Sequence, residues 1–133
     1  MTQTIALTGL ARELAARAET GKPIRVGVIG SGEMGTDLVT QMSLMSGIEM
    51  AAIATRRPQT ALDAMTIAYG DDARGRTADS PAQASAAIAA GKIAITSAET
   101  LVTTPNIDVV IDATGKPGVA ADYDLLAMEH GKH

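Results

Sequence analysis

The chain has 133 residues, of which 46% are hydrophobic and 20% charged, and a formal net charge of −4. This composition is typical of one globular domain, and the acidic balance argues against general nucleic-acid binding, because phosphate contacts need a basic face. The absence of cysteine excludes disulfides and thiolate chemistry. The only two histidines, His130 and His133, stand at the end of the chain, which argues against a histidine triad or a multi-histidine metal site. No apolar run approaches the length that a membrane span needs.

Residues 4–20 carry apolar side chains at three- and four-residue spacing, which predicts a helix ended by Gly21. The inward positions are Leu7, Leu10, Ala11, Leu14 and Ala18. We expect residues 1–21 to form an N-terminal helical arm that packs on the domain or on a partner subunit. Residues 22–133 are expected to form the main domain.

The next part of the chain alternates β-branched apolar runs with amphipathic stretches. Strands are predicted over 24–30 and 48–55, and helices over 33–46 and 58–69. The apolar stripe of the first of these helices consists of Met34, Leu38, Met42 and Met45.

The second half of the chain begins with a polar, glycine-containing stretch, predicted as a loop over 70–79. The predicted elements that follow are a helix over 81–90, a strand over 92–96, a helical turn over 98–102, a strand over 107–112 and a helix over 118–129. Ser97 is the expected cap of the helical turn. Val119, Tyr123, Leu126 and Ala127 share the inward face of the last helix.

Alternation of strands and helices predicts a Rossmann-type α/β fold, a parallel sheet with helices on both faces, preceded by the N-terminal helix. The closing Gly131-Lys132-His133 is typical of the approach to another strand. We therefore expect the chain to be the N-terminal part of a longer protein whose substrate domain lies beyond it.

Gly30-Ser31-Gly32-Glu33-Met34-Gly35 matches G-x-G-x-x-G, directly after a predicted strand and at a helix start. Gly30 is expected to allow the tight turn, Gly32 to let the backbone approach a diphosphate, and Gly35 to let the helix pack on the strand. Amide N–H groups of Ser31, Glu33 and Met34, with the helix dipole, are expected to hold the phosphates. The alternative is a glycine turn that binds no ligand.

NAD-type sites place Asp or Glu about 20 residues after this motif, on the adenosine ribose. The chain has Thr55 there, followed by Arg56 and Arg57. Arginine binds phosphate bidentately, so this pair predicts a site for the 2′-phosphate of NADP, with the Thr55 hydroxyl as a further donor. The alternative is two solvated arginines at a strand end. The missing acidic residue also argues against a methyltransferase, because those enzymes bind ribose hydroxyls there.

The segment from Asp112 to Pro117 follows a later strand, at the sheet edge where α/β proteins bind ligands. Ala113 and Gly115 are expected to leave space for a ribose or nicotinamide, and Thr114 to hydrogen-bond there. Lys116 is either a phosphate ligand or an exposed surface lysine. Asp112 is expected to cap the following turn rather than act as a catalytic acid.

Three segments, 28–35, 54–57 and 107–116, resemble the N-terminal nucleotide domain of homoserine-dehydrogenase-like oxidoreductases. Within that group the chain looks most like the branch of 1-deoxy-D-xylulose 5-phosphate reductoisomerase-like (DXR-like) enzymes. The resemblance implies a homo-oligomeric, NADPH-dependent reductase that acts with a divalent metal on a phosphorylated sugar, converting 1-deoxy-D-xylulose 5-phosphate to 2-C-methyl-D-erythritol 4-phosphate in isoprenoid-precursor synthesis. The family's catalytic residues lie in a later domain, so no catalytic residue and no metal ligand is assigned in this chain.

The sequence thus predicts the NADP(H)-binding part of a cytoplasmic oxidoreductase with a small-molecule substrate and no nucleic-acid or membrane partner. The chain alone is expected to bind the nucleotide without turnover. A homoserine-dehydrogenase-type enzyme and a non-catalytic NAD(P)-sensing module remain the alternatives.

Overall fold

One five-stranded sheet organises the computed structural model, which describes residues 9–30, 32–115 and 117–133. The strands run in the order β3-β4-β2-β1-β5, and every neighbouring pair is parallel. Their bounds are β1 Ile24–Ile29, β2 Ile48–Ala54, β3 Gly75–Thr77, β4 Ile93–Thr96 and β5 Val109–Asp112.

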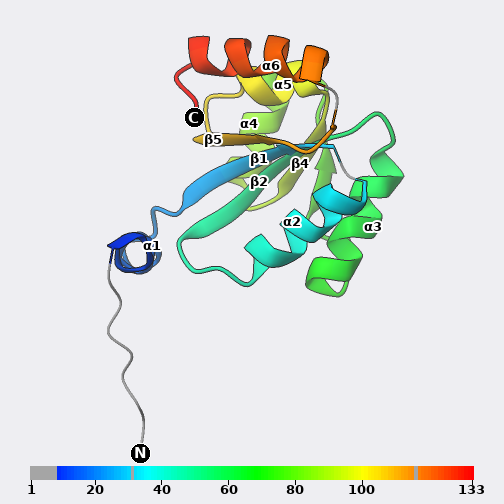
Figure 1. Ribbon diagram of the computed structural model, residues 1–133. Helices are drawn as coiled ribbons and strands as arrows, with labels where there is room; N and C mark the ends of the chain where they lie inside the picture. Colours follow the sequence, from blue (N-terminus) through cyan, green and yellow to red (C-terminus); the bar gives the residue numbers. More distant parts are fainter. Residues whose placement is uncertain (1–8, 31, 116) are drawn as a thin grey trace, which may run out of the picture.

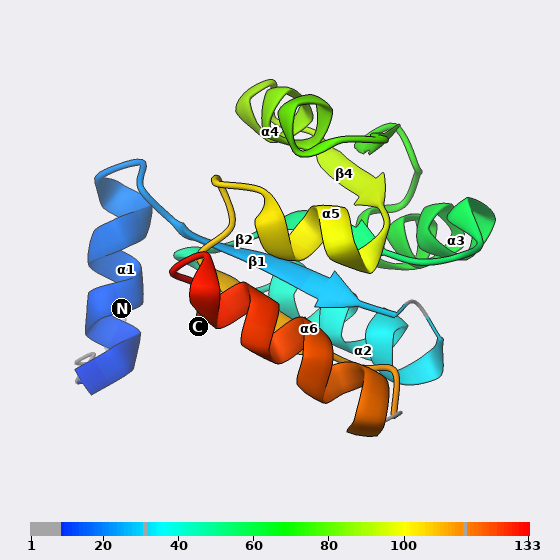
Figure 2. The same ribbon diagram turned by 90° about the horizontal axis from the view of Figure 1, so that it is seen from above.

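Helices cover both faces of this sheet (Figures 1 and 2). In Figure 1, α2 and α3 lie below the sheet, and α4, α5 and α6 lie above it. The helices are α1 Gly9–Glu19, α2 Glu33–Ser43, α3 Pro58–Tyr69, α4 Pro81–Ala89, α5 Ala98–Thr103 and α6 Pro117–Glu129. The predicted Rossmann-type arrangement is confirmed.

The strand order changes direction at β1. From β1 the chain passes to β2 on one side, and it returns after β4 to β5 on the other side. Adjacent crossovers that leave in opposite directions open a crevice at the carboxyl ends of the strands, which is where α/β sheets bind ligands.

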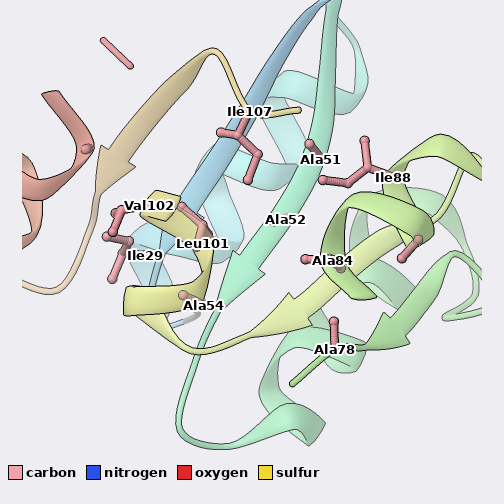
Figure 3. Packing of buried hydrophobic residues seen from close by; sticks show 13 residues of the cluster. Ile29, Ala51, Ala52, Ala54, Ala78, Ala84, Ile88, Leu101, Val102 and Ile107 are labelled. Carbon is pink, nitrogen blue, oxygen red and sulfur yellow. The ribbon is translucent and has the colours of Figure 1, made fainter. Parts of the chain in front are cut away.

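The two faces of the sheet carry side chains of different size. The face toward α2 and α3 presents larger residues, among them Val28, Met50 and Ile53. The face toward α4, α5 and α6 carries alanines, among them Ala51, Ala52 and Ala54, in one cluster with Leu101 and Val102, and Figure 3 shows Ala51 next to Ile88 of α4. The small residues of the sheet let α5 approach it closely. A Cβ on Gly27 of β1 would stand 2.7 Å from Cδ2 of Leu101 of α5. Close packing of this kind supplies the dispersion contacts that aromatic residues provide in other cores.

The helix predicted over 58–69 is confirmed residue for residue, and the predicted cap is present, because Ser97 Oγ accepts the N–H of Thr100 at 3.2 Å. On α6, Tyr123, Leu126 and Ala127 pack in the core as predicted, whereas the Val119 side chain lies outside the described part. The other predicted element ends within the described residues either coincide with the observed ends or differ from them by one to three residues, and the predicted helix start at residue 4 lies outside the described part.

The predicted loop over 70–79 is wrong in its middle, because residues 75–77 form the edge strand β3. The strand is only Gly-Arg-Thr, so it has no alternation of apolar and polar residues to detect. It exists because β4 provides a parallel partner and because Gly75 fits against Leu62, Met65 and Ile95.

Part of the predicted apolar stripe of α2 is also wrong. Leu38 and Met42 pack in the core, but Met45 is 45% exposed. The helix ends at Ser43, two residues before Met45, so helical periodicity no longer sets the direction of that side chain. The Met34 side chain lies outside the described part.

Helix α1 stands at the end of the sheet where β1 begins, far from the strands' carboxyl ends (Figure 2). Of the predicted inward positions, Leu14 is buried and Leu7 precedes the described residues. The prediction is wrong for Leu10, which is 68% exposed, and for Ala11 and Ala18, which are also exposed. The backbone of Leu14 lies so close to Gly47 that a Cβ there would overlap its carbonyl group. The turn of α1 that carries Leu14 therefore contacts the domain at Gly47.

The chain ends beside β5. The N–H of His133 donates to the carbonyl of Asp108 at 3.0 Å, and the N–H of Val110 donates to the carbonyl of His133 at 2.7 Å. These are the bonds of a parallel strand pairing, so the sequence Gly131-Lys132-His133 does lead into strand geometry on the outer edge of β5. Within the described residues, no helix combines the length and apolar character needed to cross a membrane.

Candidate functional site

The turn after β1 begins at Gly30, whose backbone conformation and contacts the structure describes. Gly30 has φ +100°, which a residue with a Cβ rarely adopts, and its N–H donates to the Ala54 carbonyl at 2.8 Å. The backbone of Ala113 lies close, 3.4 Å from where a Cβ on Gly30 would be. The turn is thus held between β2 and the segment after β5. Ser31 lies outside the described residues.

Gly32 and Gly35 serve different purposes at the start of α2. Gly32 is the N-cap, makes no side-chain cap, and would place a Cβ in open space. A Cβ on Gly35 would overlap the carbonyl oxygen of Gly30, so the absence of a side chain lets α2 pack against the turn, as predicted. Gly32 therefore offers no side chain to cap the first turn of α2, and a helix N-terminus of this kind favours an anion. Glu33 and Met34 open this helix, but the positions of their side chains are not described.

A cavity of about 640 Å³ opens at the carboxyl ends of the strands. The ends of β1, β2 and β4, the segment after β3, Thr114 and Tyr123 of α6 all contribute to its lining. The lining residues are Ile29, Gly30, Ala54, Thr55, Arg56, Pro58, Thr77, Ala78, Asp79, Ile95, Thr96, Ser97, Ala98, Thr114 and Tyr123. The glycine turn and the arginine segment, which were predicted separately, therefore open into one cavity.

The segment after β2 is held by hydrogen bonds that involve Thr55 and Thr60. The N–H of Thr55 donates to the Thr96 carbonyl at 3.1 Å, which ties the segment to β4. Thr55 Oγ1 accepts the N–H of Arg57 at 3.1 Å, and Thr60 Oγ1 donates to the Arg57 carbonyl at 2.7 Å. Both arginines are exposed, but only Arg56 of the two lines the cavity. Of the predicted pair, the structure places Arg56 at the site, whereas the Arg57 side chain does not contribute to its wall.

The segment after β5 is a turn capped by Asp112, as predicted. Asp112 Oδ1 accepts the N–H of Thr114 at 2.9 Å and its hydroxyl at 2.7 Å. Thr114 reaches the cavity, whereas Ala113 and Gly115 do not line it. The predicted space beside these two residues is therefore not part of this cavity. Lys116 lies outside the described residues.

Several lining residues were not predicted from the sequence. Asp79 follows β3, Ser97 follows β4, and Tyr123 belongs to α6. Asp79 and β3 were missed for the same reason: the strand that brings this segment to the sheet edge was predicted to be a loop. Ser97 and Tyr123 were assigned to a cap and a core face, and both are confirmed in those positions while also lining the cavity.

Two groups with displaced pKa values lie outside the lining of the cavity. Burial raises the pKa of Tyr69, while Arg74, whose guanidinium stands 4.6 Å from the ring centre, opposes that shift. Burial lowers the pKa of Lys132, and the charge of Asp108 opposes that shift. Among the residues that the structure describes, no three His, Asp or Glu side chains gather as a metal site.

These features define a Rossmann-type domain with a cavity at its strand ends. Such a domain occurs in scyllo-inositol dehydrogenase from Lactobacillus casei, whose crystal structure holds NAD(H) and scyllo-inositol. The two structures superimpose with a TM-score of 0.60 at 18% sequence identity, over 84% of this chain and 27% of that one. The chain thus spans about a quarter of the length of that dehydrogenase, and the likeness is one of fold. No protein-family model matches the sequence, and no curated protein matches it.

Proposed function

We propose that this chain is the cofactor-binding domain of an NADP(H)-dependent oxidoreductase. The observation that carries the proposal is the shared cavity: Gly30 of the glycine turn and Arg56 line one cavity at the sheet edge where a dinucleotide spans the crevice of such folds. The structurally similar dehydrogenase binds NAD(H) with the same fold, which supports a nicotinamide cofactor here.

Residue types favour the phosphorylated form of the cofactor. Arg56 supplies a permanent positive charge at the end of β2, where NAD-type sites carry a carboxylate. The diphosphate would lie over Gly32, which leaves its backbone accessible, with the adenosine toward Arg56. When bound, the nicotinamide supplies the hydride chemistry, and the chain's residues bind and orient the cofactor.

The substrate is a separate question. The resemblance to the DXR-like branch favours reduction of a phosphorylated sugar by a homo-oligomer with a divalent metal, with a homoserine-type substrate as the alternative. The structurally similar scyllo-inositol dehydrogenase from Lactobacillus casei acts instead on scyllo-inositol, a polyol without phosphate. We propose the phosphorylated sugar on the resemblance alone. A turnover assay of a protein that joins this domain to a substrate domain, with both substrates, distinguishes them.

A binding experiment tests the cofactor. We expect the chain to bind NADPH more tightly than NADH in a calorimetric titration. Arg56→Ala should weaken NADPH binding about ten-fold and change NADH binding less than two-fold, because a charge-assisted contact to the 2′-phosphate is lost. Arg57→Ala is the matched control and should change either affinity less than two-fold, since its side chain does not line the cavity. Equal affinity of the wild type for both cofactors contradicts the NADP assignment.

The alternative of a non-catalytic NAD(P)-sensing module predicts the same binding and the same lack of turnover by this chain, so only turnover by a protein that also contains a substrate domain separates the two. Our proposal places the catalytic groups outside this chain, and the isolated chain should therefore bind NADPH without reducing a substrate. Reductase activity of these 133 residues alone contradicts that division of labour.

A further inference from the structure

A closed ring of hydrogen bonds surrounds the segment that carries Arg56. Thr60 Oγ1 donates to the Arg57 carbonyl at 2.7 Å, the shortest bond of the set. The Thr55 hydroxyl lies 3.2 Å from Thr60 Oγ1 and 3.3 Å from the Arg57 carbonyl, so its proton has an acceptor in the ring either way. The N–H of Arg57 closes the ring on Thr55 Oγ1 at 3.1 Å.

The ring fixes the backbone on both sides of Arg56. Thr55 is anchored to β4 through the Thr96 carbonyl, and Arg57 has its N–H and its carbonyl in the ring. Arg56 is the single residue between these two fixed points. An exposed arginine side chain loses much rotamer entropy when it binds, so a fixed backbone reduces what binding must still order.

We propose, resting on the proposed NADP(H) function, that Thr60 is a positioning residue that directs Arg56 at the 2′-phosphate through this ring. Thr60 belongs to the first turn of α3 and does not line the cavity itself. Its hydroxyl acts on the ligand only through the Arg57 carbonyl and Thr55. The ring thus couples cofactor choice to a side chain of α3 that lies outside the lining of the cavity.

The test uses two ligands that differ by one group, adenosine 2′,5′-bisphosphate and 5′-AMP. The wild type should bind the bisphosphate at least ten-fold more tightly in a calorimetric titration. Thr60→Val keeps the side-chain shape and removes the hydroxyl, and should reduce this preference about five-fold, with 5′-AMP affinity unchanged within two-fold. Thr60→Ser, which keeps the hydroxyl, should retain the wild-type preference.

Two controls separate positioning from general loosening. Thr66→Val removes another hydroxyl from α3, one that donates to the Leu62 carbonyl at 3.1 Å, and should leave the preference at its wild-type value. In an Arg56→Ala background, Thr60→Val should have no further effect on the preference, because its action passes through Arg56. If Thr60→Val does not fold by circular dichroism, Thr60→Ala takes its place with the same expected result.

The outcomes distinguish the two proposals. A wild type without preference for the bisphosphate overturns the NADP assignment, and the positioning role with it. If the wild type prefers the bisphosphate and Arg56→Ala abolishes that preference, but Thr60→Val keeps it, only the positioning role is wrong. Equal loss of affinity for both ligands in Thr60→Val also overturns positioning, because it indicates a general disturbance of the cavity.

Discussion

Gly30 and Gly35 shape the candidate site because they lack side chains, which allows a positive φ at Gly30 and a close backbone contact at Gly35. The carbonyl of Gly30 occupies the place where a Cβ of Gly35 would stand, and Gly30 itself has φ +100°. The two positions depend on each other, because moving the turn to accommodate a side chain at Gly35 also moves the backbone that faces the cavity. The G-x-G-x-x-G spacing is therefore a packing requirement in this chain as well as a phosphate-binding pattern.

Gly35→Ala should consequently reduce both stability and nucleotide binding. Alanine favours a helix by about 1 kcal/mol over glycine, but overlap with a backbone carbonyl costs about 1–3 kcal/mol, so we expect net destabilisation. Urea unfolding measures the first effect and an NADPH titration the second, where a loss of at least ten-fold is expected. Gly118→Ala in the first turn of α6 is the control, since its Cβ would meet nothing within 4 Å. If both variants unfold at the same urea concentration as the wild type, the close contact at Gly35 is unimportant.

The sequence predicted the helices and strands, and the residues at which they begin and end, better than any other feature of the structure. Helix α3 was predicted residue for residue because Pro58 marks its start and Gly70, at φ +88°, its end. Signals of this kind are local, because they depend only on the residues at the helix ends. Strand β3 escaped prediction because its three residues depend on β4 and on Leu62 and Met65 across the fold.

The start of α4 combines two such local signals. The N–H of Gln83 donates to Ser80 Oγ at 3.2 Å, and Gln83 Oε1 accepts the N–H of Asp79 at 2.8 Å. This reciprocal pair fixes the turn that brings Asp79 to the cavity wall.

Removal of that cap should destabilise the domain. We expect Ser80→Ala to lower the free energy of unfolding by about 1 kcal/mol, because the Gln83 N–H loses its acceptor. Ser85→Ala, the same change inside α4, is the control and should be neutral or slightly stabilising, since alanine is the better helix former. Urea unfolding of both variants decides, and equal stability of the two would show that the cap is dispensable.

At the scale of the whole molecule, the sequence predicted the sheet and the ligand-binding edge, but only part of the site. The glycine turn and Arg56 were found because each stands next to its own strand. Tyr123 and Asp79 meet them in one cavity only through the order β3-β4-β2-β1-β5, which no local pattern encodes. Prediction from sequence therefore reached the residues attached to strand ends and missed those brought in by tertiary packing.

Lys132, which follows α6, makes the free energy of unfolding depend on pH in the alkaline range. Lys132 is 5% exposed where the chain ends against β5, and burial lowers the pKa of its ammonium group despite the charge of Asp108. Burial raises the pKa of Tyr69, and this shift has the opposite effect on the free energy of unfolding. A phenol with a raised pKa loses its contribution to stability as pH rises through its folded-state pKa. The pH profile of the wild type sums both effects, so a variant is needed to separate them.

Lys132→Met isolates the lysine. Below the folded-state pKa the amine is protonated in both states, and the cost of burying the charge is fully present. As pH rises toward the ordinary value of 10.5, the unfolded chain holds more protons than the folded one, and the free energy of unfolding increases. Methionine of similar length removes the buried charge, so the variant should be more stable than the wild type at neutral pH, and this advantage should shrink as pH approaches 10.5. Urea midpoints measured from pH 7 upward test this, with Lys22→Met, at an exposed position, as the control for the loss of one positive charge. Parallel curves for Lys132→Met and the wild type would mean that the ammonium group is as well solvated in the folded chain as in the unfolded one.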